Sequence, residues 1–305
     1  MKKYRWLVMF TALILVLSAC GTGASEQEQV DNEAIGETTE KQGSFHIGVI
    51  PEVTGAEFEL AVQKLGEALE EVLPYEVEIN IYPDYNGVLE ALNFGHIQMA
   101  WLGPSTYVKA NHESGALAIS TRVVNGTPYY HSYIITHVDS PWDTLEELVE
   151  DVANVTFAFG DISSTSGSII PSREFKQLGI FVDENNHQFK NILYTGSHDA
   201  TGIAVQNKHV DAGAIDSAHY YELIKKGLLD EQQFKVLWKS EELYQYPWVV
   251  SASIEPTVVS TIQETLASVQ DPVILEGFNA EAFINASDEN YEFIRQIMIE
   301  TGKLK

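Results

Sequence analysis

The chain has 305 residues, of which 44 are acidic and 18 basic, so its formal net charge is −26. This charge opposes contact with phosphate backbones and argues against a nucleic-acid partner. A single cysteine excludes an internal disulfide and a cysteine-based metal site.

The first residues have the features of a targeting segment. Three basic residues within positions 1–5 precede an apolar run at residues 6–17, which is too short to indicate a transmembrane helix. The run ends in Leu17-Ser18-Ala19-Cys20-Gly21, which resembles the lipobox of bacterial lipoproteins. In that family the cysteine is diacylated and becomes the mature N-terminus. We therefore predict a lipoprotein signal peptide over residues 1–19 and lipidation of Cys20. The alternative is an ordinary signal peptide with an incidental cysteine.

Residues 20–43 are rich in Gly, Ser, Thr, Gln and Glu and contain almost no apolar side chains. Such a segment cannot bury enough apolar surface to offset the entropy lost on ordering, so we predict a flexible acidic tether. The folded region then begins near residue 44. No second hydrophobic span follows, so we expect the body on the extracytoplasmic face of the cell membrane, held to the bilayer by its lipid.

Strands and helices alternate in the first part of the folded region. Strands are expected at residues 45–50, 77–82 and 97–101, and helices at 57–73, 85–94 and from 103 onward. Two further strands at 116–124 and 129–137 flank a turn, and a short helix follows at 144–150. This alternation favours a parallel α/β construction.

A second α/β unit follows. Strands are expected at 155–159, 191–195 and 210–215, and helices at 168–178, 200–207 and 218–226. A strand at 236–238 returns the chain toward the first unit, and apolar positions between 278 and 297 bring the last helices back onto it. Two α/β lobes joined by crossing strands would enclose a cleft at the C-terminal ends of their strands, where open α/β sheets bind ligands.

The turn at residues 160–167, between a strand and a helix of the second unit, has the composition of an anion cradle. It contains four consecutive hydroxyl residues, 163–166, and Pro171 fits the start of the helix that follows. Free backbone N–H groups, hydroxyl donors and the positive end of a helix dipole would converge there. A plain helix cap is the alternative. The turn contains no Lys or Arg, so it would bind an anion through neutral donors.

Several motifs occur in a familiar order: Tyr82-Pro83-Asp84-Tyr85, Met99-Ala100-Trp101-Leu102-Gly103-Pro104, Phe159-Gly160-Asp161, Ser164-Thr165-Ser166-Gly167, Gly196-Ser197-His198-Asp199 and Val210-Asp211-Ala212-Gly213-Ala214. Together they resemble the phosphate/phosphite/phosphonate-binding proteins of bacterial ABC importers. The resemblance implies a two-lobed periplasmic-binding-protein fold of type II, with no catalysis and no cofactor. It also implies a small phosphorus oxyanion as ligand and an ABC permease in the membrane as partner.

The resemblance also implies the positions of the lobes and of the oxyanion donors. Lobe 1 would take residues 44–136 plus 248–305, and lobe 2 residues 137–247. The donors would be Tyr85, Tyr130, Ser164, Thr165, Ser166 and His198, with Ser105, Thr106 and Asp216 as further candidates. Ser, Thr and Tyr hydroxyls donate to an oxyanion without bringing a full charge. A helix N-terminus would keep the His198 imidazole neutral until an anion arrives.

The ligand is expected to lack a positive tail. Family members that favour aminoalkylphosphonates carry acidic residues for the ammonium group, and this chain has Ala218 and Tyr246 at the corresponding positions. An unpaired ammonium would be costly to bury in a closed cleft. Phosphite or a short alkylphosphonate therefore ranks ahead of phosphate, for which no acceptor of the remaining protons is evident. Asp216 lies near the same loop and could replace the missing acid.

Two other classes of protein remain as alternatives. A serine hydrolase would need a base and an orienting acid beside the hydroxyl cluster, and only His198-Asp199 offers such a pair. The chain also lacks a Gly-x-Ser-x-Gly elbow. A metal-binding lipoprotein could use the nine histidines, but these do not fall at the helical spacing of a metal site.

Mass spectrometry of the membrane fraction should detect a lipid-modified N-terminus at Cys20, because the lipobox follows an apolar run and precedes a polar tether. A soluble protein with an unmodified Cys20 would contradict the predicted anchor.

Overall fold

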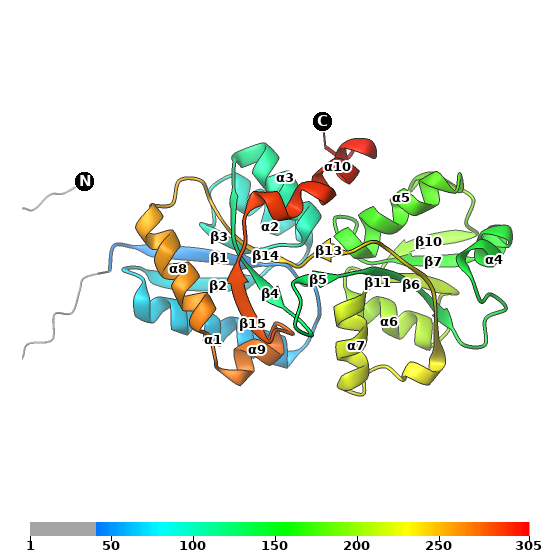
Figure 1. Ribbon diagram of the computed structural model, residues 1–305, viewed down its shortest axis with the longest axis horizontal. Coiled ribbons are helices and arrows are strands. Elements are labelled where there is room, and N and C mark those ends of the chain that lie inside the picture. The colour runs from blue at the N-terminus through cyan, green and yellow to red at the C-terminus, as the bar shows by residue number, and fades with distance from the viewer. Residues whose placement is uncertain (1–40, 305) are drawn as a thin grey trace, which may run out of the picture. The chain divides into compact units, whose positions relative to one another are not determined.

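The computed structural model describes residues 41–304. The predicted signal peptide, Cys20 and most of the predicted tether lie outside the described residues. Among the described residues no helix has the length and apolar character needed to cross a membrane. Their strands form two larger sheets and two short two-stranded pairs (Figure 1).

The first sheet has six strands in the order β15-β4-β14-β3-β1-β2. Its strands are β1 (Ser44–Val49), β2 (Glu76–Ile81), β3 (Met99–Trp101), β4 (Leu117–Val123), β14 (Pro247–Val250) and β15 (Ala282–Asn285). Strand β1 pairs parallel with β2 and β3, whereas β14 runs antiparallel between β3 and β4. Its helices are α1 (Ala56–Val72), α2 (Tyr85–Asn93), α3 (Pro104–Ser114), α8 (Pro256–Ser268), α9 (Pro272–Gly277) and α10 (Glu292–Glu300). We call this sheet with its helices lobe 1.

The second sheet has five strands in the order β10-β7-β11-β6-β12. Its strands are β6 (Ser132–His137), β7 (Thr156–Phe159), β10 (Asn191–Tyr194), β11 (Ala212–Asp216) and β12 (Phe234–Lys239). Strands β10, β7 and β11 are parallel, and β6 runs antiparallel between β11 and β12. Its helices are α4 (Leu145–Glu150), α5 (Ile170–Gln177), α6 (His198–Gln206) and α7 (Ser217–Lys225). We call this unit lobe 2.

Two short strands, β5 (Tyr129–Tyr130) and β13 (Leu243–Tyr244), pair antiparallel where the chain passes between the sheets (Figure 1). Strands β8 (Phe181–Asp183) and β9 (Asn186–His187) form a hairpin at the edge of lobe 2. Strand β6, from Ser132, already belongs to the second sheet, so we place the first crossing at residues 124–131. The division into lobes that move separately, at residues 44–136 plus 248–305 and 137–247, stays a prediction.

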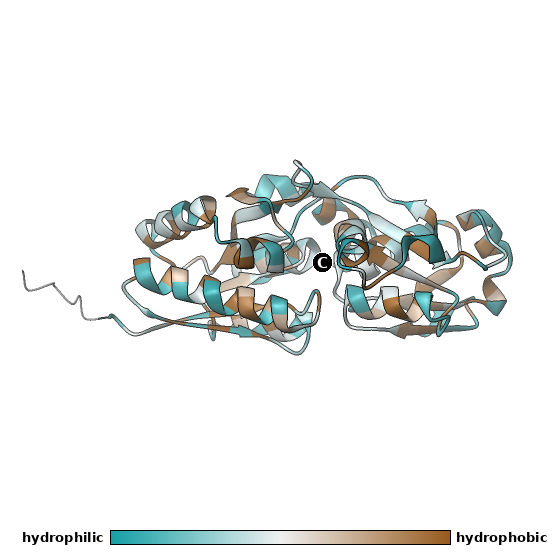
Figure 2. Cartoon of the chain, turned by 90° about the horizontal axis from the view of Figure 1, so that it is seen from below, coloured by the Kyte–Doolittle hydropathy of each residue, from teal (hydrophilic) through white to brown (hydrophobic). Residues whose placement is uncertain are grey.

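Each lobe has its own apolar core. In lobe 1, one face of α1 is buried, and Gly66 on this helix lets it approach β2 so closely that a Cβ would lie 2.5 Å from Ile79 Cγ2. In lobe 2, the rings of Phe157, Phe159 and Phe175 pack edge to face. Figure 2 shows helices that carry both hydrophilic and hydrophobic residues, as expected when only one face is buried.

Candidate anion-binding site

The hydroxyl-rich turn of lobe 2 forms a tight loop rather than a simple helix start. The Gly160 N–H donates to the Gly167 carbonyl at 2.8 Å, and a Cβ on Gly160 would lie only 3.3 Å from the Gly167 Cα. Ser164 Oγ accepts from the Gly167 N–H at 3.1 Å. The predicted helix at 168–178 begins instead with a π-turn, Thr165–Ile169, followed by α5. Ser164 therefore acts as a cap, which was the alternative for this turn.

Thr165 contacts lobe 1 directly. Its Oγ1 accepts from the Ser105 backbone N–H at 2.8 Å and lies 2.9 Å from Ser105 Oγ. The hydroxyls of Ser105 and Thr106, at the start of α3, donate to the Ser163 carbonyl at 2.9 and 3.4 Å. These predicted donors are brought together, and they join the two lobes at one side of the site.

Two predicted donors are buried without any hydrogen-bond partner. They are the hydroxyls of Ser166, in the π-turn, and of Tyr130, in β5. A buried hydroxyl left unpaired is costly, so these two groups are candidates to donate to a ligand. Successive side chains of a strand point to opposite faces, so only one of the two tyrosines of β5 points inward. It is Tyr130, which is 2% exposed, whereas Tyr129 is 42% exposed.

Tyr85 is the first residue of α2, where Asp84 caps the helix through the Gly87 N–H at 2.8 Å. Its side chain is buried, and its backbone N–H lies 3.5 Å from Asp161 Oδ2 in lobe 2. Burial, together with the charges of Glu52 and Asp161, raises the pKa of Tyr85 well above its ordinary value. Burial likewise raises the pKa of Tyr130. Both phenols are therefore hydrogen-bond donors at physiological pH.

The contacts of His198, the first residue of α6, determine its tautomer. Its Nδ1 accepts from the Asp216 backbone N–H at 3.3 Å, so its proton is on Nε2 and is donated to Tyr246 Oη at 3.0 Å. Burial and the neighbouring His219 lower the pKa of His198 well below its ordinary value, so the ring is neutral. Ser197 occupies the N-cap position of α6 but forms no side-chain cap bond.

Asp216 places a carboxylate at the same site. Its Oδ1 caps α7 by accepting from the N–H groups of Ala218 and His219 at 2.6 and 3.3 Å. Its Oδ2 is buried and has no partner. Burial raises the pKa of Asp216. The site thus contains a buried acceptor as well as buried donors.

Tyr246 is a site residue that the sequence analysis named only as a position without an acidic side chain. Its hydroxyl accepts from His198, so its own proton remains available to another acceptor. Trp248, two residues further along the chain, packs on Trp101 with the ring centroids 5.0 Å apart.

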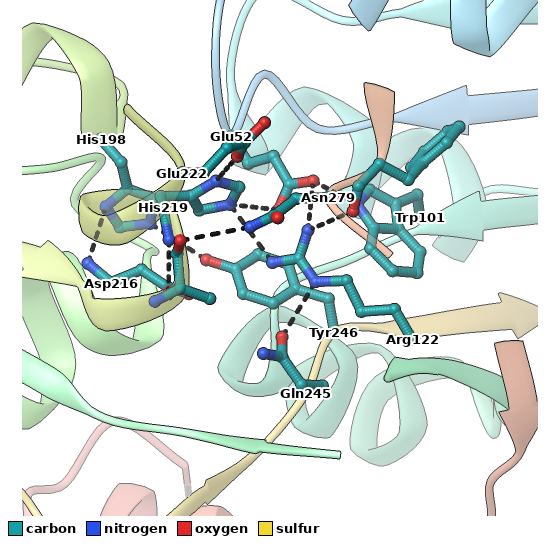
Figure 3. A network of polar contacts seen from close by, with 12 residues as sticks. Glu52, Trp101, Arg122, His198, Asp216, His219, Glu222, Gln245, Tyr246 and Asn279 are labelled. Atoms are coloured by element: carbon teal, nitrogen blue, oxygen red, sulfur yellow. Dashed lines mark hydrogen bonds and ion pairs between the residues drawn. The ribbon is translucent and has the colours of Figure 1, made fainter. Parts of the chain in front are cut away.

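A buried charge network packs against the ring of Tyr246 (Figure 3). Glu52, in the loop after β1, accepts from Trp101 Nε1 at 3.0 Å, from Arg122 Nη1 at 3.2 Å and from His219 Nε2 at 3.0 Å. Arg122, in β4, also donates to Gln245 Oε1 at 2.9 Å and to the Phe278 carbonyl at 2.8 Å. Sequence analysis missed this network. The available signal was a lone arginine inside an otherwise uncharged strand.

The contacts at the site also bear on the alternative functions. Both ring nitrogens of His198 are occupied by Tyr246 and Asp216, so His198 forms no pair with a serine of the cradle. Within residues 41–304, no group of three or more His, Cys, Asp or Glu side chains is arranged to hold a metal ion.

Arg122→Met should destabilise the fold by about 3–5 kcal/mol, because it leaves Glu52 buried without its guanidinium partner. The free energy of unfolding in urea measures this loss. Arg173→Met is the matched control, since its partner Glu300 is half exposed, and it should cost about 0–1 kcal/mol. Equal losses in both variants would contradict the assigned role of Arg122.

Comparison with known proteins places the chain among transport proteins. Residues 47–291 match the family model described as "ABC transporter, phosphonate, periplasmic substrate-binding protein". The chain is 27% identical to the phosphonates-binding periplasmic protein of Escherichia coli over 76% of its own length and 69% of that protein. It is 25% identical to the phosphate-import protein PhnD of Mycolicibacterium smegmatis over 95% and 94% of the two chains.

Solved structures share the architecture. The structure of PhnD1 from Prochlorococcus marinus in complex with methylphosphonate is 21% identical and has a TM-score of 0.75, with 85% of this chain and 98% of that chain covered. This likeness confirms the predicted two-lobed periplasmic-binding-protein fold. The comparisons give no support to a serine hydrolase or a metal-binding lipoprotein.

Proposed function

Because the chain belongs to the family of periplasmic substrate-binding proteins of phosphonate ABC transporters, we propose that it captures a small phosphorus oxyanion and passes it to a membrane permease. Its relatives support this ligand class, since two are named for phosphonates and phosphate and one solved structure is a complex with methylphosphonate. We also propose that it acts by binding alone, without catalytic turnover. In this proposal the protein works outside the cytoplasm, held to the membrane by a lipid on Cys20.

The observation that carries the proposal is the convergence of buried polar groups that have no partner. Tyr130 Oη comes from a crossing strand, and Ser166 Oγ and Asp216 Oδ2 come from lobe 2. The protons of the Tyr85 and Tyr246 hydroxyls add two further donors. An oxyanion between the lobes would satisfy these groups and remove the desolvation cost that each bears in its absence.

Asp216 bears on which oxyanion is bound. Its free Oδ2 can accept a proton from a P–OH group, which is the acceptor that the sequence interpretation lacked for phosphate. We therefore propose a singly protonated oxyanion and place phosphate beside phosphite and methylphosphonate. An ammonium tail is disfavoured, because Ala218 and Tyr246 bring no second carboxylate to the site.

Calorimetric titration with phosphite, phosphate, methylphosphonate and 2-aminoethylphosphonate tests the ligand class. One of the first three should bind most tightly. Tightest binding of 2-aminoethylphosphonate would show that Asp216 pairs with an ammonium group, and no binding by any of the four would refute the proposed function.

Tyr130→Phe and Ser166→Ala should each weaken binding of the preferred oxyanion by about 1.5–3 kcal/mol, or about 10- to 150-fold, since each removes a donor to a charged acceptor. Tyr129→Phe is the control, because Tyr129 is the neighbour of Tyr130 in β5 and its exposed side chain points away from the site. Circular dichroism checks that the variants are folded. Unchanged affinity in both site variants would place the ligand elsewhere.

A further inference from the structure

His219, on α7 of lobe 2, has both ring nitrogens against carboxylates. Nε2 lies 3.0 Å from Glu52 Oε2, and Nδ1 lies 3.0 Å from Glu222 Oε2. A neutral imidazole has one N–H and a carboxylate only accepts, so both bonds form only if His219 is an imidazolium. Burial opposes that charge, but Glu52 and the two hydrogen bonds outweigh it and raise the pKa of His219 to about 10.

The Glu52–His219 pair joins the two lobes, because Glu52 follows β1 of lobe 1. Among the ion pairs between the lobes within residues 41–304, it alone has both side chains buried. Lys226 and Glu57 also pair across the lobes at 3.0 Å, but Glu57 is 77% exposed and such pairs contribute little. If the lobes separate, the Glu52–His219 pair breaks. Glu52 then keeps its pair with Arg122, and His219 keeps its pair with Glu222.

The charge of His219 also affects the binding residues. Its ring lies nearly parallel to that of His198, with centroids 5.3 Å apart and an interplanar angle of 21°. Two adjacent imidazolium rings would repel each other, so a charged His219 keeps His198 neutral. His198 then donates to Tyr246, and the Tyr246 hydroxyl is free to donate to the anion.

We propose that Glu52 and His219 form a proton-linked latch, an inference that rests on the proposed function. As the lobes close on the anion, His219 takes up a proton and pairs with Glu52. His219 touches no ligand in this arrangement and acts as a positioning residue through His198 and Tyr246. The latch makes closure, and therefore affinity, depend on a group outside the binding pocket.

The other groups around His219 favour its protonation in the closed state on balance. Those that face it are Glu52 from the loop after β1, Arg122 from β4, Glu222 and Asp216 from α7 and its cap, His198 from α6 and Tyr246 from the segment after β13. Arg122 Nη2 lies 3.2 Å from Nε2 and opposes the charge. The carboxylates of Glu52 and Glu222 exceed this repulsion.

The direction of the pH dependence follows from the raised pKa of His219 in the closed state. In the open state its pKa is closer to the ordinary value of about 6.5. The contribution of the latch is therefore complete below that pH and is lost as the pH rises toward about 10.

The test is the affinity for methylphosphonate at pH 7 and pH 9 in the full chain and in His219→Gln. Between pH 7 and pH 9 the affinity of the wild type should fall by a factor at least about ten times larger than the factor for the variant. The ionisation of methylphosphonate itself affects both proteins equally and cancels in the comparison. Arg173→Gln, which removes the exposed cross-lobe pair with Glu300 and touches neither Glu52 nor His219, should retain the pH dependence of the wild type.

Glu222→Gln provides a second variant if His219→Gln does not fold. This variant leaves His219 with one carboxylate partner, which lowers the pKa of His219 in the closed state. The fall in affinity should therefore occur at lower pH. Equal pH dependence in the wild type and the His219 or Glu222 variant would overturn the latch while the binding function stood. No binding of any phosphorus oxyanion by the wild type would overturn the proposed function, and the latch with it.

Discussion

Arg122 is the residue on which much of lobe 1 near the site depends. A guanidinium buried in a strand must have its N–H groups satisfied, and its donors reach Glu52, Gln245 and the Phe278 carbonyl. It also lies over the ring of Tyr246, 4.6 Å from the centroid. One side chain thereby fixes the loop after β1, the crossing segment and the end of α9. The position of Tyr246 follows from these contacts.

The net charge of the whole chain does not describe the balance of charges at its site. The chain carries a formal net charge of −26, yet the buried cations Arg122 and His219 balance the buried anions Glu52 and Glu222. The cradle itself presents hydroxyls and backbone groups. Directed hydrogen bonds can bind an anion inside an acidic protein when buried charges such as these four are paired with one another.

Local sequence patterns predicted the elements well, but the contacts between lobes poorly. Alternation and helical spacing predicted β1 to β4 of lobe 1 and the sheet strands of lobe 2, and the motif around Ser166 located the turn of lobe 2. They did not predict β14, β15, α8 or α9, and Phe283, expected in a helix, lies in β15. The role of Ser164 as a cap depends on a π-turn that periodicity does not reveal. Glu52, Arg122 and His219 are far apart in the sequence, and no local pattern pairs them. Their meeting depends on the contacts between the two lobes.

The position of β14 has a consequence for biosynthesis. Strand β14 lies between β3 and β4 in the first sheet, although about 120 residues separate it in sequence from β4. The strands of lobe 2 are contiguous in the chain, from β6 to β12. During translation lobe 2 can complete its sheet first, while β3 and β4 wait with unpaired edges for a strand not yet made. The nascent chain is therefore most exposed to misassociation in its earliest part.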